Sequence, residues 1–114
     1  MVTKKYYTIG IVSQIIKIHP HTLREYEREG LISPRRSEGK IRLYTDKDIE
    51  DIRFIRTLTR ELGVNLAGVD IILRMRKQVE KMEENIDRIM QLIKEKIDRE
   101  YKEKDSQTIE IKVE

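Results

Sequence analysis

The strongest constraint on the fold is one narrow apolar stripe in the last third of the chain. Its members lie three or four residues apart, and they are Met75, Val79, Met82, Ile86, Ile89, Ile93 and Ile97, followed by Tyr101. Almost all the residues between them are charged or carry amides. This is the repeat of a coiled coil, and a helix with a single stripe cannot bury it alone. We therefore predict a coiled-coil dimerisation helix over residues 75–104, with those members from 75 to 97 at the interface.

The simplest partner for this helix is the same helix of a second copy, because such a helix is ~40 Å long at 1.5 Å per residue. The preceding residues are too few to cover it, so packing within one chain is the weaker alternative. The sequence leaves the orientation of the two helices open. Residues 105–114 follow as an extended or disordered tail, in which Ile109, Ile111 and Val113 alternate with charged residues.

The net charge of +3 is unevenly distributed along the 114 residues. Residues 1–60 hold 13 Lys and Arg against 8 Asp and Glu, whereas residues 61–114 hold 11 against 13. A basic head on a slightly acidic body is typical of a nucleic-acid-binding protein, although domains of other classes show a similar asymmetry. The length allows one functional module.

Several classes of chemistry are excluded by what the sequence lacks. There is no Cys, which removes disulfides, thiolate metal ligands and a Cys nucleophile. No apolar run is long enough for a membrane span or an export signal, so we expect a cytoplasmic protein. Carboxylate pairs such as Asp46 and Asp48 have no basic partner placed by spacing, and no Ser lies in a nucleophile motif. We predict that the protein is not an enzyme and has no cofactor.

Two short helices are predicted near the N-terminus. Thr8 caps the first, over residues 9–18, where Ile and Val recur at helical spacing. Pro20 fits the first position of the second, with His19 as its cap, and Gly30 ends it. Two helices joined by so short a turn are typical of a helix-turn-helix, in which the second helix lies across the first.

A basic hairpin follows the second helix. Alternating residues over 35–44, with Gly39 at the turn, predict a small β-hairpin that would form a wing beside the helix-turn-helix. Its cationic residues are Arg35, Arg36, Lys40 and Arg42. They could be a solvated basic turn, but cations beside a DNA-reading helix more often contact the phosphate backbone.

Two more helices complete the predicted head. Thr45 and Asp48 form a capping box for a helix that runs to Gly63, and Asn65 caps a further short helix as far as Leu73. The expected fold is therefore mainly α: a winged helix-turn-helix head of four short helices and a hairpin over residues 1–74, followed by the coiled-coil helix and the tail.

The second helix holds the candidate DNA-reading residues. A helix in the major groove needs short or flat polar residues at its first turn to reach base edges, and His21 and Thr22 lie there. Arg24 and Tyr26, further along, fit contacts to phosphates. The alternative is an ordinary surface helix with a half-buried Tyr. A metal site at His19 and His21 is not expected, because residues two apart on a helix point in different directions.

The ordered motifs resemble the MerR family of bacterial regulators over residues 8–77. They are the segments 22–27, 30–34, 42–44 and 48–49. Within that family, residues 19–24 and 63–69 are similar to the heat-shock repressor branch, HspR. The resemblance implies an antiparallel coiled-coil dimer on an inverted-repeat operator. It also implies phosphate contacts from Arg24 and Tyr26 on the helix and from Arg42 and Tyr44 on the wing.

The resemblance has two departures. The family's usual Gly in the helix-turn-helix is Lys17 here, so the turn must either avoid a left-handed conformation or tolerate its cost. The metal- and redox-sensing branches carry cysteines that this chain lacks, and a drug-binding branch would need a further domain.

We predict a homodimeric, sequence-specific repressor that binds double-stranded DNA. The resemblance to HspR implies chaperone genes as targets and the Hsp70 chaperone DnaK as co-repressor, with the alternating tail as a candidate docking segment. Pairing within the dimer or fraying is the alternative for the tail. The rival function is a coiled-coil adaptor whose basic head binds an acidic protein.

Overall fold

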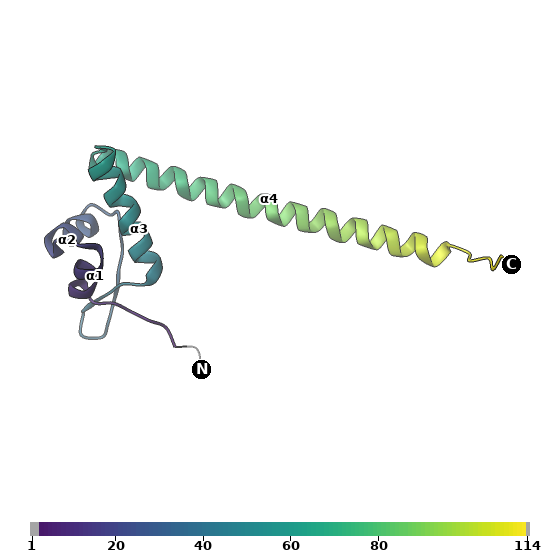
Figure 1. The fold of residues 1–114 in the computed structure, drawn as a ribbon, viewed down its shortest axis with the longest axis horizontal. Helices are drawn as coiled ribbons and strands as arrows, with labels where there is room; N and C mark the ends of the chain where they lie inside the picture. The colour runs from purple at the N-terminus through teal and green to yellow at the C-terminus, as the bar shows by residue number, and fades with distance from the viewer. Residues whose placement is uncertain (1–2, 114) are drawn as a thin grey trace. The chain divides into compact units, whose positions relative to one another are not determined.

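The computed structural model describes residues 3–113. Its elements are α1 (Ile9–Ile16), α2 (Pro20–Arg28), β1 (Arg35–Arg36), β2 (Arg42–Leu43), α3 (Asp46–Arg56), the π-helical turn η1 (Thr57–Glu61) and α4 (Leu66–Gln107) (Figure 1). This confirms the predicted fold class: mainly α, with a small hairpin and a long C-terminal helix. The chain forms two compact units, Met1–Arg74 and Met75–Glu114.

Helix α1 is two residues shorter than predicted. The Thr8 hydroxyl caps it by accepting a hydrogen bond from the Ile11 N–H at 3.5 Å. The helix ends because Lys17 adopts φ 60° and ψ 50°, and the N–H groups of Lys17 and Ile18 both donate to the Ser13 carbonyl. The turn is thus left-handed, at a cost of about 1 kcal/mol for a residue with a Cβ, and the two bonds satisfy a helix-terminal carbonyl.

The start and end of helix α2 are as predicted. His19 caps it, since its Nδ1 accepts the His21 N–H at 3.0 Å, and Pro20 occupies the first helical position. Gly30, at φ +76°, provides the left-handed residue that ends it. Leu23 and Tyr26 are buried, so the rest of the helix surface is left for contacts outside the core.

The wing is a two-stranded antiparallel hairpin in which Arg35 pairs with Leu43 and Arg36 pairs with Arg42. Gly39 lies in the turn of the hairpin as predicted, although the residue with the positive φ, 62°, is its neighbour Lys40. The Lys40 N–H donates to the Ser37 carbonyl at 2.9 Å, which closes a four-residue turn around Glu38 and Gly39. The Ser37 N–H donates to the Ile41 carbonyl at 2.9 Å and joins the two strands beyond this turn.

Helix α3 begins with the predicted capping box. Thr45 N–H donates to Asp48 Oδ2 at 2.8 Å, and Asp48 N–H donates to Thr45 Oγ1 at 3.1 Å. The helix ends at Arg56, earlier than predicted, because the next five residues wind as the wider turn η1. Gly63, at φ +65°, then ends this segment.

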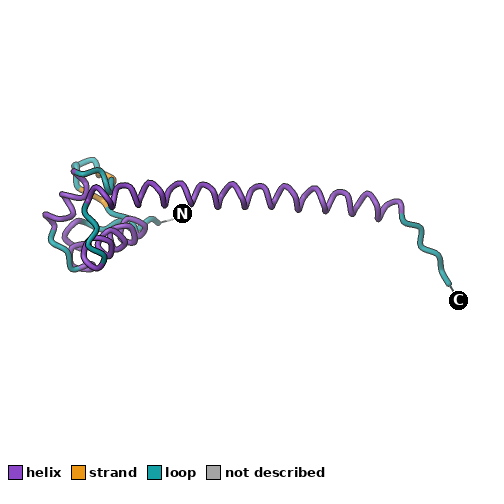
Figure 2. Tube along the Cα trace, turned by 90° about the horizontal axis from the view of Figure 1, so that it is seen from above, coloured by secondary structure: helices purple, strands orange, loops and turns teal. Residues whose placement is uncertain are grey.

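Helix α4 is one unbroken helix of 42 residues (Figure 2). Asn65 caps it as predicted, with its Oδ1 accepting the Gly68 N–H at 2.8 Å. The expected boundary between a short helix ending at Leu73 and a separate long helix is wrong, since no residue there breaks the backbone ladder. What changes along α4 is burial: Val69 is 0% exposed, whereas Met75 is 58% exposed.

The core of the first unit gathers buried residues from all of its helices and from the residue that follows β2. Its fully buried members are Val12, Leu23, Tyr44, Ile52, Ile55 and Val69. Tyr7 and Tyr44 exchange backbone hydrogen bonds, both of 2.8 Å, so the N-terminal segment adds an isolated bridge to the base of the wing. This core fixes α2 and the wing against the same support, which is what a composite binding surface needs.

Candidate nucleic-acid interface

Three side chains spaced for one helix face form the exposed surface of α2. His21, Arg24 and Arg28 follow each other at three and four residues and are all exposed, while the side chain of Thr22 is half-buried. Arg28 was missed by the sequence analysis because it lies beyond the first turns that a groove-reading helix uses. The arrangement offers an imidazole near the helix start and two guanidinium groups further along.

Two of the predicted phosphate contacts are corrected by burial. Tyr44 is 0% exposed, so its hydroxyl is enclosed in the core and is not presented to a ligand. Desolvation by this burial raises the pKa of Tyr44. Tyr26 is only 4% exposed and belongs to the same cluster of buried hydrophobic residues. Both tyrosines belong to the support of the surface.

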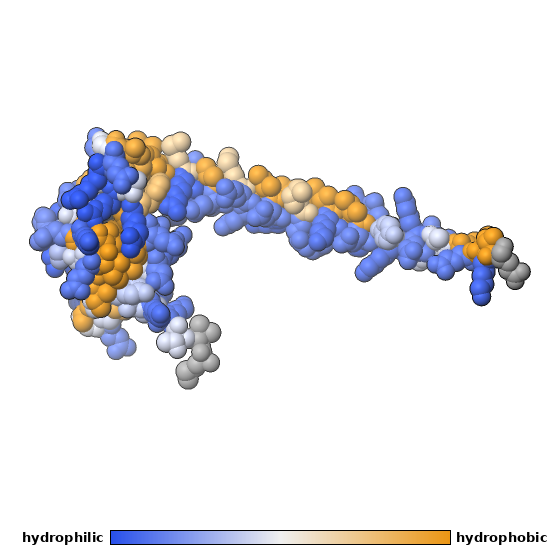
Figure 3. Space-filling model, viewed as in Figure 1, coloured by the Kyte–Doolittle hydropathy of each residue, from blue (hydrophilic) through white to orange (hydrophobic). Residues whose placement is uncertain are grey.

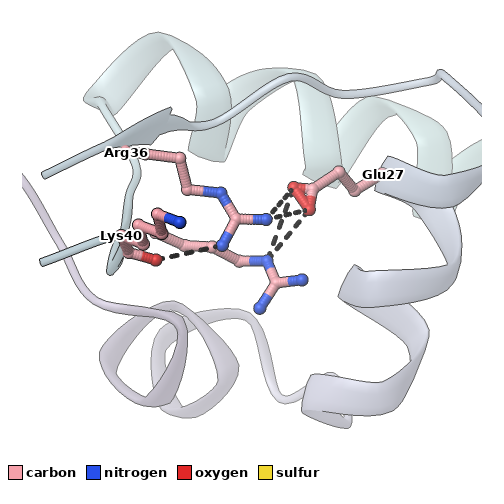
Figure 4. A network of polar contacts seen from close by, with 4 residues as sticks. Glu27, Arg36 and Lys40 are labelled. Atoms are coloured by element: carbon pink, nitrogen blue, oxygen red, sulfur yellow. Dashed lines mark hydrogen bonds and ion pairs between the residues drawn. The ribbon is translucent and has the colours of Figure 1, made fainter.

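Glu27 joins α2 to the wing (Figure 4). Its Oε1 accepts from Arg36 at 2.9 Å and from the Nε of Arg42 at 3.0 Å. The other terminal nitrogen of Arg36 donates to the Lys40 carbonyl at 3.2 Å. One carboxylate of α2 therefore holds two arginines of the hairpin, and charge-assisted bonds of this kind fix geometry as well as energy.

This network engages the wing cations to different degrees. Arg36 bonds within the protein through both of its terminal nitrogens, while its side chain stays 44% exposed, so its contact to a phosphate stays a prediction. Arg42 uses its Nε, and within residues 3–113 no bond to its two terminal nitrogens is seen. Arg42 and the exposed ammonium group of Lys40 are thus the better candidates for contacts to an anion. The sequence analysis missed Glu27 because a carboxylate 9 and 15 residues before its partners follows no helical or strand period.

Arg35 lies on the other side of the hairpin from Arg36, because neighbouring residues of a strand point to opposite faces. Its Nη1 donates to the Tyr6 hydroxyl at 3.0 Å. The wing thus carries cations on two faces, one turned to α2 and one turned to the N-terminal segment.

The apolar stripe of α4 is exposed in the single chain. A band of hydrophobic side chains follows the helix (Figure 3), and the seven predicted interface residues are 47–64% exposed. Arg76 and Glu80 pair at 3.4 Å beside the stripe. An apolar stripe of this length without cover indicates a partner surface.

Within residues 3–113, no group of three or more metal-ligating side chains gathers. No helix in the same part of the chain has the length and apolar content to cross a membrane.

A helix-turn-helix with a wing tied to its second helix defines this chain as a winged helix-turn-helix regulator. The chain belongs to the MerR HTH family of regulatory proteins, whose sequence pattern matches residues 7–76. The resemblance to this family is thereby confirmed.

Curated relatives share the head region. The heat shock protein HspR of Streptomyces coelicolor is 40% identical over 77 residues, which is 68% of this chain and 51% of that protein. The HTH-type transcriptional regulator ZntR of Escherichia coli is 35% identical over 71 residues, or 61% of this chain and 50% of that protein. The chain thus spans about half the length of these relatives. Both are named for roles in stress response or regulation, and neither as an enzyme.

Solved structures share the fold over most of the chain. PbrR691 from Ralstonia metallidurans, in complex with lead(II), has a TM-score of 0.57 and 26% identity, covering 94% of this chain and 91% of that one. HiNmlR, a MerR family regulator lacking the sensor domain and bound to promoter DNA, has a TM-score of 0.60 and 24% identity, covering 89% and 80%.

Proposed function

We propose that two copies of this protein bind an inverted-repeat DNA operator and repress transcription, and that the targets are heat-shock or chaperone genes. The observation that carries DNA binding is the exposed face of α2, with His21, Arg24 and Arg28, next to a wing that Glu27 fixes in place. Membership of the MerR family supports it. The protein would act in the cytoplasm, where such operators lie.

Within this proposal some surface residues contact base edges and others contact phosphates. His21 and Thr22 lie at the first turn of α2, where side chains reach base edges in the major groove. Arg24, with Arg28, contacts phosphates from the helix, and Lys40 and the free end of Arg42 do so from the wing. Arg35 lies on the opposite face of the wing and would contact a phosphate from there.

Dimerisation follows from the exposed stripe on α4. Pairing two copies would bury Met75, Val79, Met82, Ile86, Ile89, Ile93 and Ile97, and each buried CH₂ contributes ≈ 0.8 kcal/mol. A dimer also links two heads, so that binding of one half-site raises the effective concentration of the second head at the other. The inverted repeat is the operator symmetry that a two-fold dimer requires.

The function is tested by selecting the binding site from random DNA and measuring affinity for it and for random duplexes. His21→Ala should narrow the gap between the two by ~1–3 kcal/mol with little change in salt dependence, because a base contact is lost. Arg24→Ala should weaken both duplexes similarly and reduce the salt slope by ~0.9. If Arg24→Ala instead removes the operator preference and His21→Ala does not, the two roles are reversed.

The same DNA-selection assay distinguishes a DNA-binding repressor from the rival function, a coiled-coil adaptor. An adaptor whose basic head binds an acidic protein would select no DNA sequence, and random DNA would compete with any selected fragment equally well. Sequence selection with poor competition by random DNA is the expected result.

The heat-shock assignment is supported by the 40% identity to HspR. We propose an Hsp70 chaperone, DnaK, as co-repressor, with the tail after α4 as its docking segment, where Ile109, Ile111 and Val113 are exposed. Alternate side chains of an extended peptide can occupy pockets of a partner. Deleting residues 108–114 should leave operator affinity unchanged and remove any enhancement by the chaperone; equal enhancement without the tail would exclude this docking site.

A further inference from the structure

A basic depression lies on the side of the wing that faces away from Glu27. It has a volume of about 550 Å³ and is bordered by the N-terminal segment, β1 and the start of α3. Four of its lining side chains are cationic: Lys4, Lys5, Arg35 and Lys47. These four residues define what we call the flank groove.

The carboxylates of the flank groove are already engaged. Asp46 accepts a hydrogen bond from the Tyr7 hydroxyl at 2.8 Å, and Asp48 accepts from the Thr45 N–H at 2.8 Å in the capping box. They satisfy groups of the fold and leave the four cations as the groups that face an incoming ligand. With two carboxylates against four cations, the groove carries a net positive charge.

The two faces of the hairpin separate this groove from the surface built by α2. Arg36 and Arg42 form a cross-strand pair on the face turned to Glu27. Arg35, one residue before Arg36, turns to Tyr6 and into the groove. An anion in the flank groove is therefore a different group from those within reach of Arg24 or the free end of Arg42.

We propose that the flank groove binds the phosphate backbone of duplex DNA outside the segment that α2 reads. The inference rests on the proposed function. Three features favour duplex DNA: the groove adjoins the wing, it is wide enough for more than one phosphate group, and flexible lysines suit a repeating backbone charge. The flank groove would add affinity and no base recognition, because cations that displace condensed counterions bind phosphates of any sequence.

The test compares operators of two lengths. One duplex ends at the edges of the selected site, and the other extends about ten base pairs further on each side, one helical turn. The wild-type protein should bind the longer duplex more tightly and with a steeper salt dependence, by ~0.9 in slope for each added phosphate contact. The triple variant Lys4→Gln, Lys5→Gln, Lys47→Gln should lose this gain and bind the short duplex as the wild type does.

A matched control removes the same charge elsewhere. Lys77, Lys81 and Lys96 are exposed on α4, and their replacement by Gln should leave the gain from longer DNA intact. Equal binding of both lengths by the wild type would overturn the inference, as would an equal loss by the groove variant on both lengths. If poly-glutamate rather than flanking DNA competes for the groove lysines, the site belongs to an acidic protein and the proposal is wrong. Absence of any operator selection would instead count against the proposed function.

Discussion

At the residue scale, burial decides which polar side chains belong to the support and which belong to the surface. Arg42 lies in β2 and Tyr44 directly follows that strand, and both carry groups suited to phosphate. Tyr44 is fully buried, whereas Arg42 bonds to Glu27 with one nitrogen and retains two more. A residue that matches a family motif can therefore contact a ligand only if its polar group is exposed, and the packing around it decides this.

The buried hydroxyl of Tyr44 should lower the stability of the fold. Within residues 3–113 it has no hydrogen-bond partner, and an unpaired buried hydroxyl costs ~1–3 kcal/mol. Tyr44→Phe should therefore raise the free energy of unfolding by about 1 kcal/mol in urea titrations at fixed protein concentration, and leave operator affinity unchanged. Tyr101→Phe, on the exposed part of α4, is the control and should change little. Weakened DNA binding by Tyr44→Phe would contradict the burial argument.

The same residue predicts a pH dependence. Burial raises the pKa of Tyr44 above the ordinary value of about 10, which the unfolded chain keeps. The stabilising contribution of the neutral phenol is fully present below pH 10 and is lost as the pH rises through the folded-state pKa. The stability advantage of Tyr44→Phe should therefore widen above pH 10, measured by chemical unfolding across that range.

Glu27 provides a third prediction at this scale. Glu27→Gln releases part of the hold on Arg36 and Arg42, so it should lower the free energy of unfolding by about 1 kcal/mol, as expected of a partly exposed ion-pair network. Operator affinity should fall as the wing loses its fixed position. Glu29→Gln removes an equal charge from the exposed end of α2 and should tighten DNA binding slightly, because one repulsive charge is gone. Equal behaviour of the two variants would show that Glu27 acts through charge alone.

At the scale of elements, the connection between α3 and α4 is the most constrained. The π turn η1, Gly63 at positive φ and the Asn65 cap reverse the chain within a few residues. An N–H of this connection, that of Val64, donates to the Leu58 carbonyl at 2.9 Å. Close packing in the first turn of α4 leaves little space for an added methyl group.

Gly68 tests this packing. A Cβ at Gly68 would lie 2.8 Å from Val64 Cγ1 and 3.2 Å from Asn65 Oδ1. Gly68→Ala should therefore destabilise the head by ~1–3 kcal/mol through overpacking, although Ala is the better helix former. Gly10 in α1 has nothing within 4 Å of its added Cβ, so Gly10→Ala should stabilise by ~0.5–1 kcal/mol. Denaturant unfolding of both variants measures the contrast, and a stabilised Gly68→Ala would refute the tight packing.

At the scale of the whole molecule, the proposed dimer depends on the exposed apolar stripe of α4 after Arg74. The stripe is exposed in the single chain. A charged residue placed there should therefore leave the stability of the folded head of a monomer unchanged. In a dimer each such charge would be buried without a partner, at several kcal/mol per ion.

Ile86→Asp combined with Ile93→Asp should therefore give a monomer whose head is folded. Operator affinity should drop by orders of magnitude because the half-sites are no longer linked. Sedimentation measures the mass, and circular dichroism checks the fold. Asn85→Asp with Gln91→Asp adds charge to the same helix outside the stripe and should stay dimeric. A dimer that survives in the first variant would refute this interface.

The sequence by itself determined the local structure. Thr8, His19, Thr45 and Asn65 cap their helices as predicted, because a cap depends on a side chain and the N–H groups two or three residues beyond it. The wing and the stripe follow in the same way from short periods of two and of three to four residues. The order of the helices and the hairpin follows from these local signals, whereas the exposed face of α2 needed the structure to remove Tyr26 and add Arg28.

The tertiary structure alone decided which groups meet across longer distances. Glu27 reaches Arg42 across 15 positions, and the Tyr7 hydroxyl reaches Asp46 across 39. Contacts of this kind depend on how α2, the wing and the N-terminal segment pack on a shared core, and no periodicity in the chain records them. For the same reason only packing could place Tyr44 inside that core and leave the flank groove open at the wing's other face.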